Sequence, residues 1–406
     1  MKKTTSCFVA ALLSSAAFAN TATYYVAMDG DDSAAGTADA PLLSVLTAVT
    51  RANESIDGGD DSATIHVAPG TYDLTSEESH ISLTNAVAIV GNPDNPAQVV
   101  ILNNSTSHRA VNLKHASSAL KGLTIKRTSG TWDPDPSGWS GGGLVHMGNG
   151  IIEDCVIQGG SLGSSNSTIS QQGGNVYMVG GIIRRCKILD GKATTKNNSS
   201  YRNKVAVGNI VVQGTTGVIP VIENSLISSG SGFGSVSTDA NCRAKAGNLY
   251  LNGSCRIVNC TIINGSGNGV GGVSIYYNSD YADCKVVNCV MYNNGGSTTR
   301  LYKDWGSDNA DSKGFFVNCA IGNATKPNNT CIGVDAAAFE NFSGGDFRPL
   351  KDASSLIDAG TSRGDYKSVY GATSDTDLAG GSRFGGRNLD IGCYERVKYG
   401  LIITVQ

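Results

Sequence analysis

The sequence predicts an all-β fold, a right-handed parallel β-helix in which the short strands of a single-stranded solenoid stack on their counterparts in successive coils. One observation is a seven-residue block that recurs as IIEDCVI at 151–157, IIRRCKI at 182–188, VIENSLI at 221–227, RIVNCTI at 256–262, KVVNCVM at 285–291 and FFVNCAI at 315–321. The fifth residues of successive blocks are 31, 39, 35, 29 and 30 positions apart. A period this short and irregular is typical of coils joined by loops of variable length.

A second apolar ladder runs in phase with the first. Its members follow a Gly-Gly or Gly-Asn step: GGLVHM at 142–147, GNVYM at 174–178, GNIVV at 208–212, GNLYL at 247–251 and GGVSI at 271–275. Each period therefore holds two β-rich segments, and neither has the 3.6-residue spacing of a helix. This second observation favours a β-solenoid over a helical repeat.

A column of small residues occupies the fifth position of the blocks, namely Cys155, Cys186, Ser225, Cys260, Cys289 and Cys319. Equivalent side chains in adjacent coils lie about 4.8 Å apart, so each must tolerate an identical neighbour. Cysteine behaves as a small buried hydrophobe, and a nucleophile or metal ligand would not be repeated up a whole stack. We interpret the column as core packing. The asparagines that precede several of its members predict a repeated tight turn with left-handed backbone, at Asn224, Asn259, Asn288 and Asn318.

Charged residues also stack from coil to coil. Glu153 and Asp154 are followed one coil later by Arg184 and Arg185, and then by Glu223. Such a cluster resembles an active site, but the repeat itself explains it as exposed ion pairs between neighbouring coils. A one-coil offset also separates Cys255 from Cys284, which permits a disulfide that only the geometry can decide.

The N-terminus predicts secretion. Residues 1–19 have a basic start at Lys2 and Lys3, a mostly apolar stretch at 7–13 and the small-x-small sequence Ala-Phe-Ala at 17–19. We therefore expect a protein that is secreted, extracellular or on the cell surface of a bacterium. Without this segment the chain has 29 basic and 34 acidic residues, a net charge of −5, which argues against nucleic acid as a partner. No later apolar run is long enough for a transmembrane helix, and we expect a monomer.

Three further segments follow the signal. Residues 20–63 predict a strand and a short amphipathic helix that covers the open end of the solenoid, with Leu42, Val45, Leu46 and Val49 on its apolar face. Residues 64–330 form the β-helix repeats. Residues 331–406 form a C-terminal coil or cap.

Two stretches resemble known families. YYVAMDGDD, APLLSVLTAV and VAPGTY, within 24–102, are similar to the N-terminal part of secreted bacterial β-helix proteins of the pectin-lyase-like superfamily. GGDFRPLKDASSLIDAGTS and DTDLAGGSRFGGRNLDIGCYE resemble the C-terminal signature of choice-of-anchor Q domain proteins, whose name implies surface attachment. The residues on this signature are Asp358, Asp377, Arg383, Asp390 and Glu395. We expect them to fix the last coil through charge-assisted hydrogen bonds.

Two loops carry the candidate site residues. In 127–143, Trp132 and Trp139 can stack on sugar rings, while Asp133 and Asp135 can bind hydroxyls or calcium. The alternative is a loop that its own tryptophans fold against the solenoid. In 300–314, Tyr302 and Trp305 are further candidates for glycan contact, and Asp304, Asp308 and Asp311 are candidates for a Ca²⁺ site. Their order differs from that of a recognised calcium loop.

Two functions remain open. One is a secreted or cell-surface β-helix protein that binds an extracellular polysaccharide or cell-surface glycan, like an adhesin, without catalysis. The other is a polysaccharide lyase or glycoside hydrolase acting on an extracellular, uronate-rich polysaccharide, with Lys126, Asp133 and Asp135 as its catalytic candidates. Hydrolysis needs two carboxylates that face a common point, and no such pair stands out from the sequence, which favours binding without catalysis.

Overall fold

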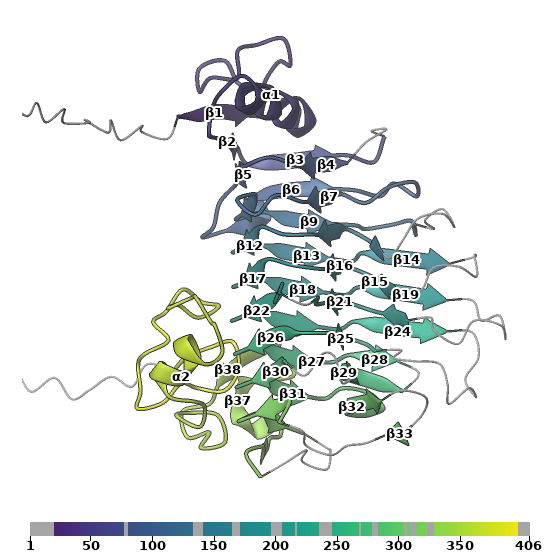
Figure 1. The fold of residues 1–406 in the computed structure, drawn as a ribbon, viewed down its shortest axis with the longest axis vertical. Coiled ribbons are helices and arrows are strands. Elements are labelled where there is room, and N and C mark those ends of the chain that lie inside the picture. The colour runs from purple at the N-terminus through teal and green to yellow at the C-terminus, as the bar shows by residue number, and fades with distance from the viewer. Residues whose placement is uncertain are drawn as a thin grey trace, which may run out of the picture.

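Short parallel strands stack into a right-handed β-helix whose axis follows the long dimension of the molecule (Figure 1). The computed structural model describes residues 20–76, 80–132, 141–164, 171–195, 205–215, 217–234, 246–267, 269–277, 283–303, 307–308, 314–322 and 329–396. The predicted signal at 1–19 lies outside these residues. The predicted fold class is confirmed by the strand pairing.

Each coil crosses three sheets in turn. Sheet 1 has ten strands: β1 (Thr21–Val26), β2 (Ser62–Val67), β5 (Val87–Val90), β8 (Ala119–Lys121), β12 (Ile151–Glu153), β17 (Ile182–Arg184), β22 (Val221–Glu223), β26 (Cys255–Val258), β30 (Cys284–Val287) and β34 (Phe316–Val317). Sheet 2 also has ten: β3 (Gly70–Asp73), β6 (Val99–Leu102), β9 (Thr124–Lys126), β13 (Val156–Gln158), β18 (Lys187–Leu189), β23 (Leu226–Ser228), β27 (Thr261–Ile263), β31 (Val290–Tyr292), β35 (Ala320–Ile321) and β36 (Ile332–Gly333).

Sheet 3 closes the coil and has nine strands: β4 (Ile81–Leu83), β7 (Val111–Leu113), β11 (Val145–Met147), β16 (Val176–Met178), β21 (Ile210–Gln213), β25 (Leu249–Asn252), β29 (Val270–Tyr277), β32 (Ser297–Lys303) and β33 (Ser307–Asp308). Between sheets 2 and 3 the central coils extend into a wing (Figure 1). One wing sheet contains β14 (Ser161–Ser164), β19 (Lys192–Thr195), β24 (Ser231–Gly234) and β28 (Ser266–Gly267). The other contains β10 (Gly141–Gly142), β15 (Gln171–Gly173) and β20 (Val205–Val207).

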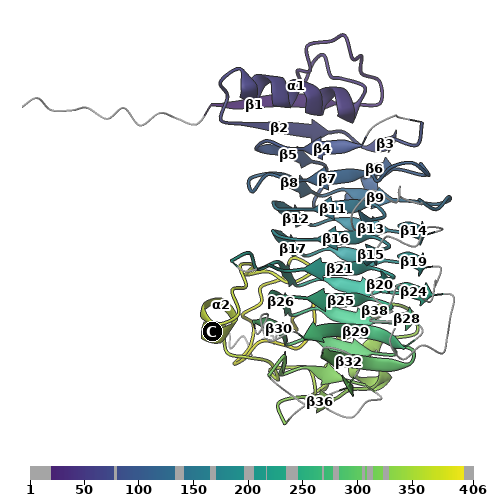
Figure 2. The ribbon, with the colours of Figure 1, turned by 45° about the vertical axis from the view of Figure 1, so that its right-hand side comes forward.

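A helix covers the N-terminal end of the solenoid, as predicted. Helix α1 (Val45–Asp57) lies across the first coil (Figure 2). Ser44 caps it by accepting hydrogen bonds from the backbone N–H groups of Leu46 and Thr47. Val45, Ala48, Val49 and Ala52 are buried on its inner face. The helix therefore shields apolar side chains and strand edges that an open coil would expose.

The cysteine column packs in the core, which confirms the interpretation made from the sequence. All six of its members are at most 1% exposed. The column thiols also contact backbone carbonyls: Cys289 Sγ lies 3.2 Å from Val287 O and 3.5 Å from Ile257 O. The residue before each member has a positive φ of 48 to 54°, at Asp154, Arg185, Asn224, Asn259, Asn288 and Asn318. The predicted tight turn between sheets 1 and 2 is thus confirmed, and we call these six positions the turn column.

A second column of asparagines lies inside the solenoid, beside the turn into sheet 3. Asn175 Nδ2 donates to Asn209 Oδ1 at 2.7 Å, Asn209 Nδ2 to Asn248 Oδ1 at 2.8 Å, and Asn248 Nδ2 to Asn294 Oδ1 at 3.1 Å. Each amide also binds backbone groups, so that Asn209 accepts from Gly191 N at 3.0 Å. The chain satisfies these buried polar groups by repeating them from coil to coil.

We predict that Asn209→Ala lowers the free energy of unfolding by about 3 kcal/mol, because it removes the buried acceptor of Asn175 Nδ2 and Gly191 N and the donor to Asn248 Oδ1. Chemical denaturation followed by circular dichroism measures the change. Asn85→Ala is the matched control, since the Asn85 side chain makes an exposed 3.4 Å contact with Asp57. Equal stability of the two variants would contradict the role given to the internal column.

Candidate functional site

The C-terminal segment, residues 350–396, folds back along the side of the solenoid. It runs beside the lower coils (Figure 1) and contains α2 (Arg363–Ser368). Tyr366 and Leu389 pack against Val258 and Val287 on the outer face of sheet 1, where all four side chains are buried. The C-terminal segment therefore lies against coils formed much earlier in the sequence.

The turn column binds this segment through its asparagine side chains. Asn224 Nδ2 donates to Tyr366 Oη and to Thr376 O, both at 3.0 Å. Asn259 Nδ2 donates to Asp390 O at 2.8 Å. Asn288 accepts from Thr361 N at 2.9 Å. The same residues that allow the tight turn thus also carry the amides that hold the C-terminal segment.

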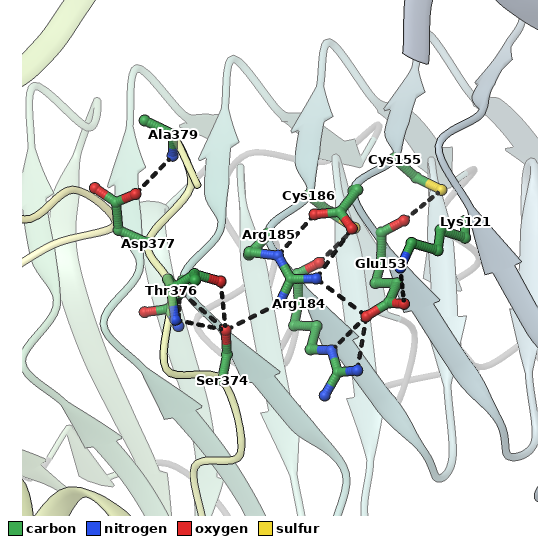
Figure 3. A network of polar contacts seen from close by, with 12 residues as sticks. Lys121, Glu153, Cys155, Arg184, Arg185, Cys186, Ser374, Thr376, Asp377 and Ala379 are labelled. Atoms are coloured by element: carbon green, nitrogen blue, oxygen red, sulfur yellow. Dashed lines mark hydrogen bonds and ion pairs between the residues drawn. The ribbon is translucent and has the colours of Figure 1, made fainter. Parts of the chain in front are cut away.

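The stacked charges continue this contact surface (Figure 3). Arg184 and Arg185 form ion pairs with Glu153 at 2.7 and 3.1 Å, and Arg185 Nη1 donates to Ser374 Oγ at 2.9 Å. The expectation of exposed pairs is wrong here, because the arginine and Glu153 side chains are only 13 to 23% exposed. Burial alone would raise the pKa of Glu153, but hydrogen bonds from Lys121 and Arg184 outweigh it and hold that pKa below its usual range.

Glu223 also departs from the predicted ladder of ion pairs. It is fully buried, and its carboxylate accepts hydrogen bonds from Thr373 N at 2.8 Å, Thr373 Oγ1 at 2.6 Å and Ser374 N at 3.1 Å. Its partners belong to the C-terminal segment rather than to Arg184 in the preceding coil. The hydrogen bonds of this buried carboxylate therefore form only when the C-terminal segment has docked on the solenoid.

The C-terminal signature residues form a buried charged cluster around Arg383, whose side chain is completely buried. Its Nε donates to Asn224 Oδ1 at 2.8 Å and its Nη1 to Glu395 Oε2 at 3.2 Å, while its Nη2 donates to Gly392 O. Asp377 accepts from three backbone N–H groups, those of Ala379, Gly381 and Glu395. Charge-assisted hydrogen bonds thus join these residues, as expected, but they fix the C-terminal segment to the coil of Asn224 in the middle of the solenoid rather than to the last coil.

Glu395 is the most perturbed carboxyl group of the cluster. Burial raises its pKa from 4.5 to about 8, against the opposing effect of Arg383. Its Oε2 accepts from Arg383 and from Asp390 N, whereas its buried Oε1 has no hydrogen-bond partner among the residues that the structure describes. Burial also raises the pKa of Asp390. Glu395 therefore holds a proton near neutral pH.

A pocket of about 700 Å³ lies beside this cluster, where the C-terminal segment meets the hairpin of β37 (Phe339–Asn341) and β38 (Asp346–Pro349). We call it the C-terminal pocket. Its lining is rich in donors and acceptors: Glu340, Arg348, Pro349, Lys351, Asp352, Ile357, Asp377, Ala379, Gly381, Tyr394, Glu395 and Arg396. Concave sites with a few converging polar groups and a perturbed pKa are the usual place of ligand binding.

Side chains of opposite charge order part of this lining. Arg348 pairs with Asp346 at 2.5 Å, and Arg396 pairs with Glu340 and also donates to Pro349 O at 2.7 Å. Lys351 and Asp352 are exposed, and neither has an ion pair among the residues that the structure describes. The pocket thus combines fixed charged groups with a free cation and a free anion. Sequence reasoning missed both residues, because a Lys-Asp step in a turn has no distinguishing pattern.

The site residues proposed from the sequence lie on different sheets. Lys126 ends β9 in sheet 2. Trp132 forms a bridge with Leu162 and so extends a wing sheet by one coil. It is 8% exposed, with the Arg109 guanidinium 4.9 Å from its ring centroid. Tyr302 lies on sheet 3, in register with Tyr276.

The remaining candidates are less fully described. Asp308 in β33 pairs in register with Tyr302. The other residues lie outside the described part of the chain, namely Asp133, Asp135, Trp139, Asp304, Trp305 and Asp311. Within the described part, no group of three or more His, Cys, Asp or Glu side chains is arranged to hold a metal ion.

Two tyrosines on the outer face of sheet 3 are packed rather than available. Tyr177 and Tyr250 are 7% and 3% exposed and contact Val207, Val211 and Ala246. A sugar ring cannot stack on aromatic faces that protein atoms already cover. The C-terminal pocket is therefore the better candidate site.

We predict that the stability of the protein decreases as the pH rises from about 5 to about 8. The folded state holds a proton on Glu395, whose pKa rises from 4.5 to about 8, whereas the unfolded state releases that proton. Glu395→Gln cannot ionise, so part of this decrease should disappear. Thermal melts across this pH range test the prediction. Glu54→Gln is the control, because Glu54 is an exposed residue of α1. An unchanged pH profile for Glu395→Gln would contradict the assignment.

Two solved structures resemble this chain. Pectate lyase Pel9A matches with a TM-score of 0.42 and 14% identity over 94% of this chain and 98% of that chain. Pectin methylesterase PemA from Erwinia chrysanthemi matches with a TM-score of 0.33 and 13% identity over 87% of this chain and 98% of that chain. At these scores the fold assignment rests on the strand pairing described above.

Sequence comparison identifies the family. No curated protein matches the chain. Among the described helices, none has the length and apolar character that crossing a membrane requires. Residues 28–256, more than half of the chain, match the family model described as "Protein of unknown function (DUF1565)", and the chain therefore belongs to the DUF1565 family.

Proposed function

We propose that this protein is a secreted or cell-surface β-helix protein that binds an extracellular glycan without cleaving it, and that the C-terminal pocket holds part of the glycan. The observation that carries the proposal is the pocket itself, with its charged donors and acceptors around a volume of about 700 Å³. This volume lies within the range of small-molecule sites. Sugar hydroxyls both donate and accept hydrogen bonds, so a lining of mixed charge suits them.

Preorganisation of the lining supports binding. Arg348 and Arg396 are already held by Asp346 and Glu340, so less side-chain freedom is lost when a ligand arrives. Lys351 and Asp352 supply a donor and an acceptor at the rim. The stiff solenoid behind the pocket gives the site a fixed position on a long rod. Secretion, on which the extracellular setting depends, rests on the signal pattern of residues 1–19.

A glycoside hydrolase is the second candidate function, and one observation favours it. Glu395 keeps its proton near neutral pH because burial raises its pKa to about 8, as a general acid requires. However, the carboxylate of Asp377 is occupied by three backbone donors, and Glu340 is paired with Arg396. Of the lining carboxylates, only Asp352 is left without such a partner among the described residues, and it is exposed whereas Glu395 is buried. Binding without catalysis fits these contacts better.

We predict that the double variant Lys351→Ala/Asp352→Ala binds its glycan at least about tenfold more weakly than the wild type, because each hydrogen bond to a charged group contributes about 1.5 kcal/mol or more. Purified protein is first screened against neutral and uronate-containing polysaccharides by affinity electrophoresis. Affinity for the retained glycan is then measured by calorimetry. Lys187→Ala serves as the matched control, since Lys187 in β18 is exposed and does not line the pocket.

The same samples decide between the two functions. We expect no increase in reducing ends and no unsaturated products. Cleavage that Glu395→Gln abolishes would establish the hydrolase instead. Unchanged glycan affinity in the double variant would rule out the pocket as the binding site.

A further inference from the structure

Cys255 and Cys284 begin strands β26 and β30 and are register partners in adjacent coils. Both are buried, with 0% and 2% exposure. Their Sγ atoms lie 3.3 Å apart. Neighbouring parallel strands are about 4.8 Å apart, which is within the Cα separation that a disulfide accepts. Formation of an S–S bond therefore needs only a small approach of the two sulfurs.

These two thiols differ from those of the cysteine column. Cys155, Cys186, Cys260, Cys289 and Cys319 each contact two backbone carbonyls through Sγ. In contrast, the Sγ atoms of Cys255 and Cys284 contact each other. Oxidation of a column pair would break contacts with carbonyls, whereas oxidation of this pair replaces a weak S–H···S contact by a covalent bond.

A neighbouring ion pair fixes the two coils at this place. Arg256 Nη2 lies 2.7 Å from both carboxylate oxygens of Asp283. Arg256 Nη1 donates to Asp283 O at 2.6 Å and to Cys255 O at 3.1 Å. The guanidinium thus bridges the residues that flank the two thiols. Such a contact holds the strands in the register that brings the sulfurs together.

We propose that Cys255 and Cys284 form a disulfide when the chain folds in an oxidising compartment. The oxidant is a disulfide of another molecule, either a thiol–disulfide oxidoreductase or a small-molecule disulfide. One thiolate attacks that disulfide and releases a thiol; the second thiolate then attacks the mixed disulfide and releases the other thiol. Two protons leave the protein, the pair loses two electrons, and the oxidant is reduced to two thiols.

The folded protein should oxidise slowly. The contact with Cys284 and burial together raise the pKa of the Cys255 thiol well above its ordinary range, so the attacking thiolate is scarce. We therefore expect the disulfide to form during folding, before the coil that carries Cys284 packs on the coil that carries Cys255. The bond then joins residues 29 positions apart and restricts the unfolded chain.

The test is peptide mapping of full-length protein refolded with oxidised and reduced glutathione. Free thiols are alkylated in denaturant before digestion. Trypsin cleaves after Arg256 and Lys285, so Cys260 and Cys284 share one peptide. The Cys260→Ser variant removes this ambiguity and is well tolerated by geometry, since Ser225 occupies the same column naturally.

We expect a Cys255–Cys284 linked peptide in both wild type and Cys260→Ser, and its absence in Cys255→Ser. We also expect the oxidised wild type to melt about 4 °C above its reduced form. Recovery of both cysteines as alkylated peptides after oxidative refolding would overturn the proposal. So would a link from Cys255 to any other cysteine. Either of these two contradicting results can be obtained with the refolded wild-type protein, so neither depends on the stability of a variant.

Discussion

Stacking of identical positions in register, one coil above the next, is the constraint on which the rest of the structure depends. At a spacing of about 4.8 Å every side chain contacts its counterpart in the next coil, so each position must hold a residue that can pack against or hydrogen-bond with a side chain of the same type. Cysteine does so as a small apolar group, and asparagine does so because its amide carries a donor and an acceptor. The internal column from Asn175 to Asn294 shows the second solution, with Nδ2 to Oδ1 contacts of 2.7 to 3.1 Å. An isolated buried asparagine would lack these partners.

The same repetition forms a surface on the outside of the solenoid to which the C-terminal segment binds. Asparagines selected by the left-handed turn place a row of amides along one edge of the solenoid, and the C-terminal segment uses that row. Arg383 and Asn224 are 159 positions apart, yet their side chains share a 2.8 Å hydrogen bond. The C-terminal pocket exists because this segment returns to the solenoid and leaves a hollow against the β37–β38 hairpin. Local turn chemistry thus determines where the candidate binding site lies.

Much of the fold was predictable from the sequence, because a repeat displays the same local choice several times. The blocks around Cys155 and Cys260 indicated the strands, the asparagines before the cysteines indicated the turns, and Val45 and Val49 indicated the covering helix. The roles of Glu223 and Asn294 were not predictable. In the sequence Glu223 continues the stacked charged positions, but its hydrogen-bond partners Thr373 and Ser374 are 150 and 151 positions away. Asn294 joins the internal column from the following coil, because Gly272 stands at the position where the earlier coils have asparagine.

The candidate site was less accessible to prediction. Aromatic residues in long loops drew attention to Trp132, which the structure places in the packed wing beneath Arg109. The C-terminal pocket is built from the β37–β38 hairpin, the turn after it and separate residues between 357 and 396, so no contiguous pattern marks it. A crystal structure of the protein with a bound oligosaccharide, chosen from the glycan screen, tests the central claim most directly. The account predicts sugar density in the C-terminal pocket, in contact with Lys351 and Asp352. Density confined to the wing or to a face of the solenoid would contradict it.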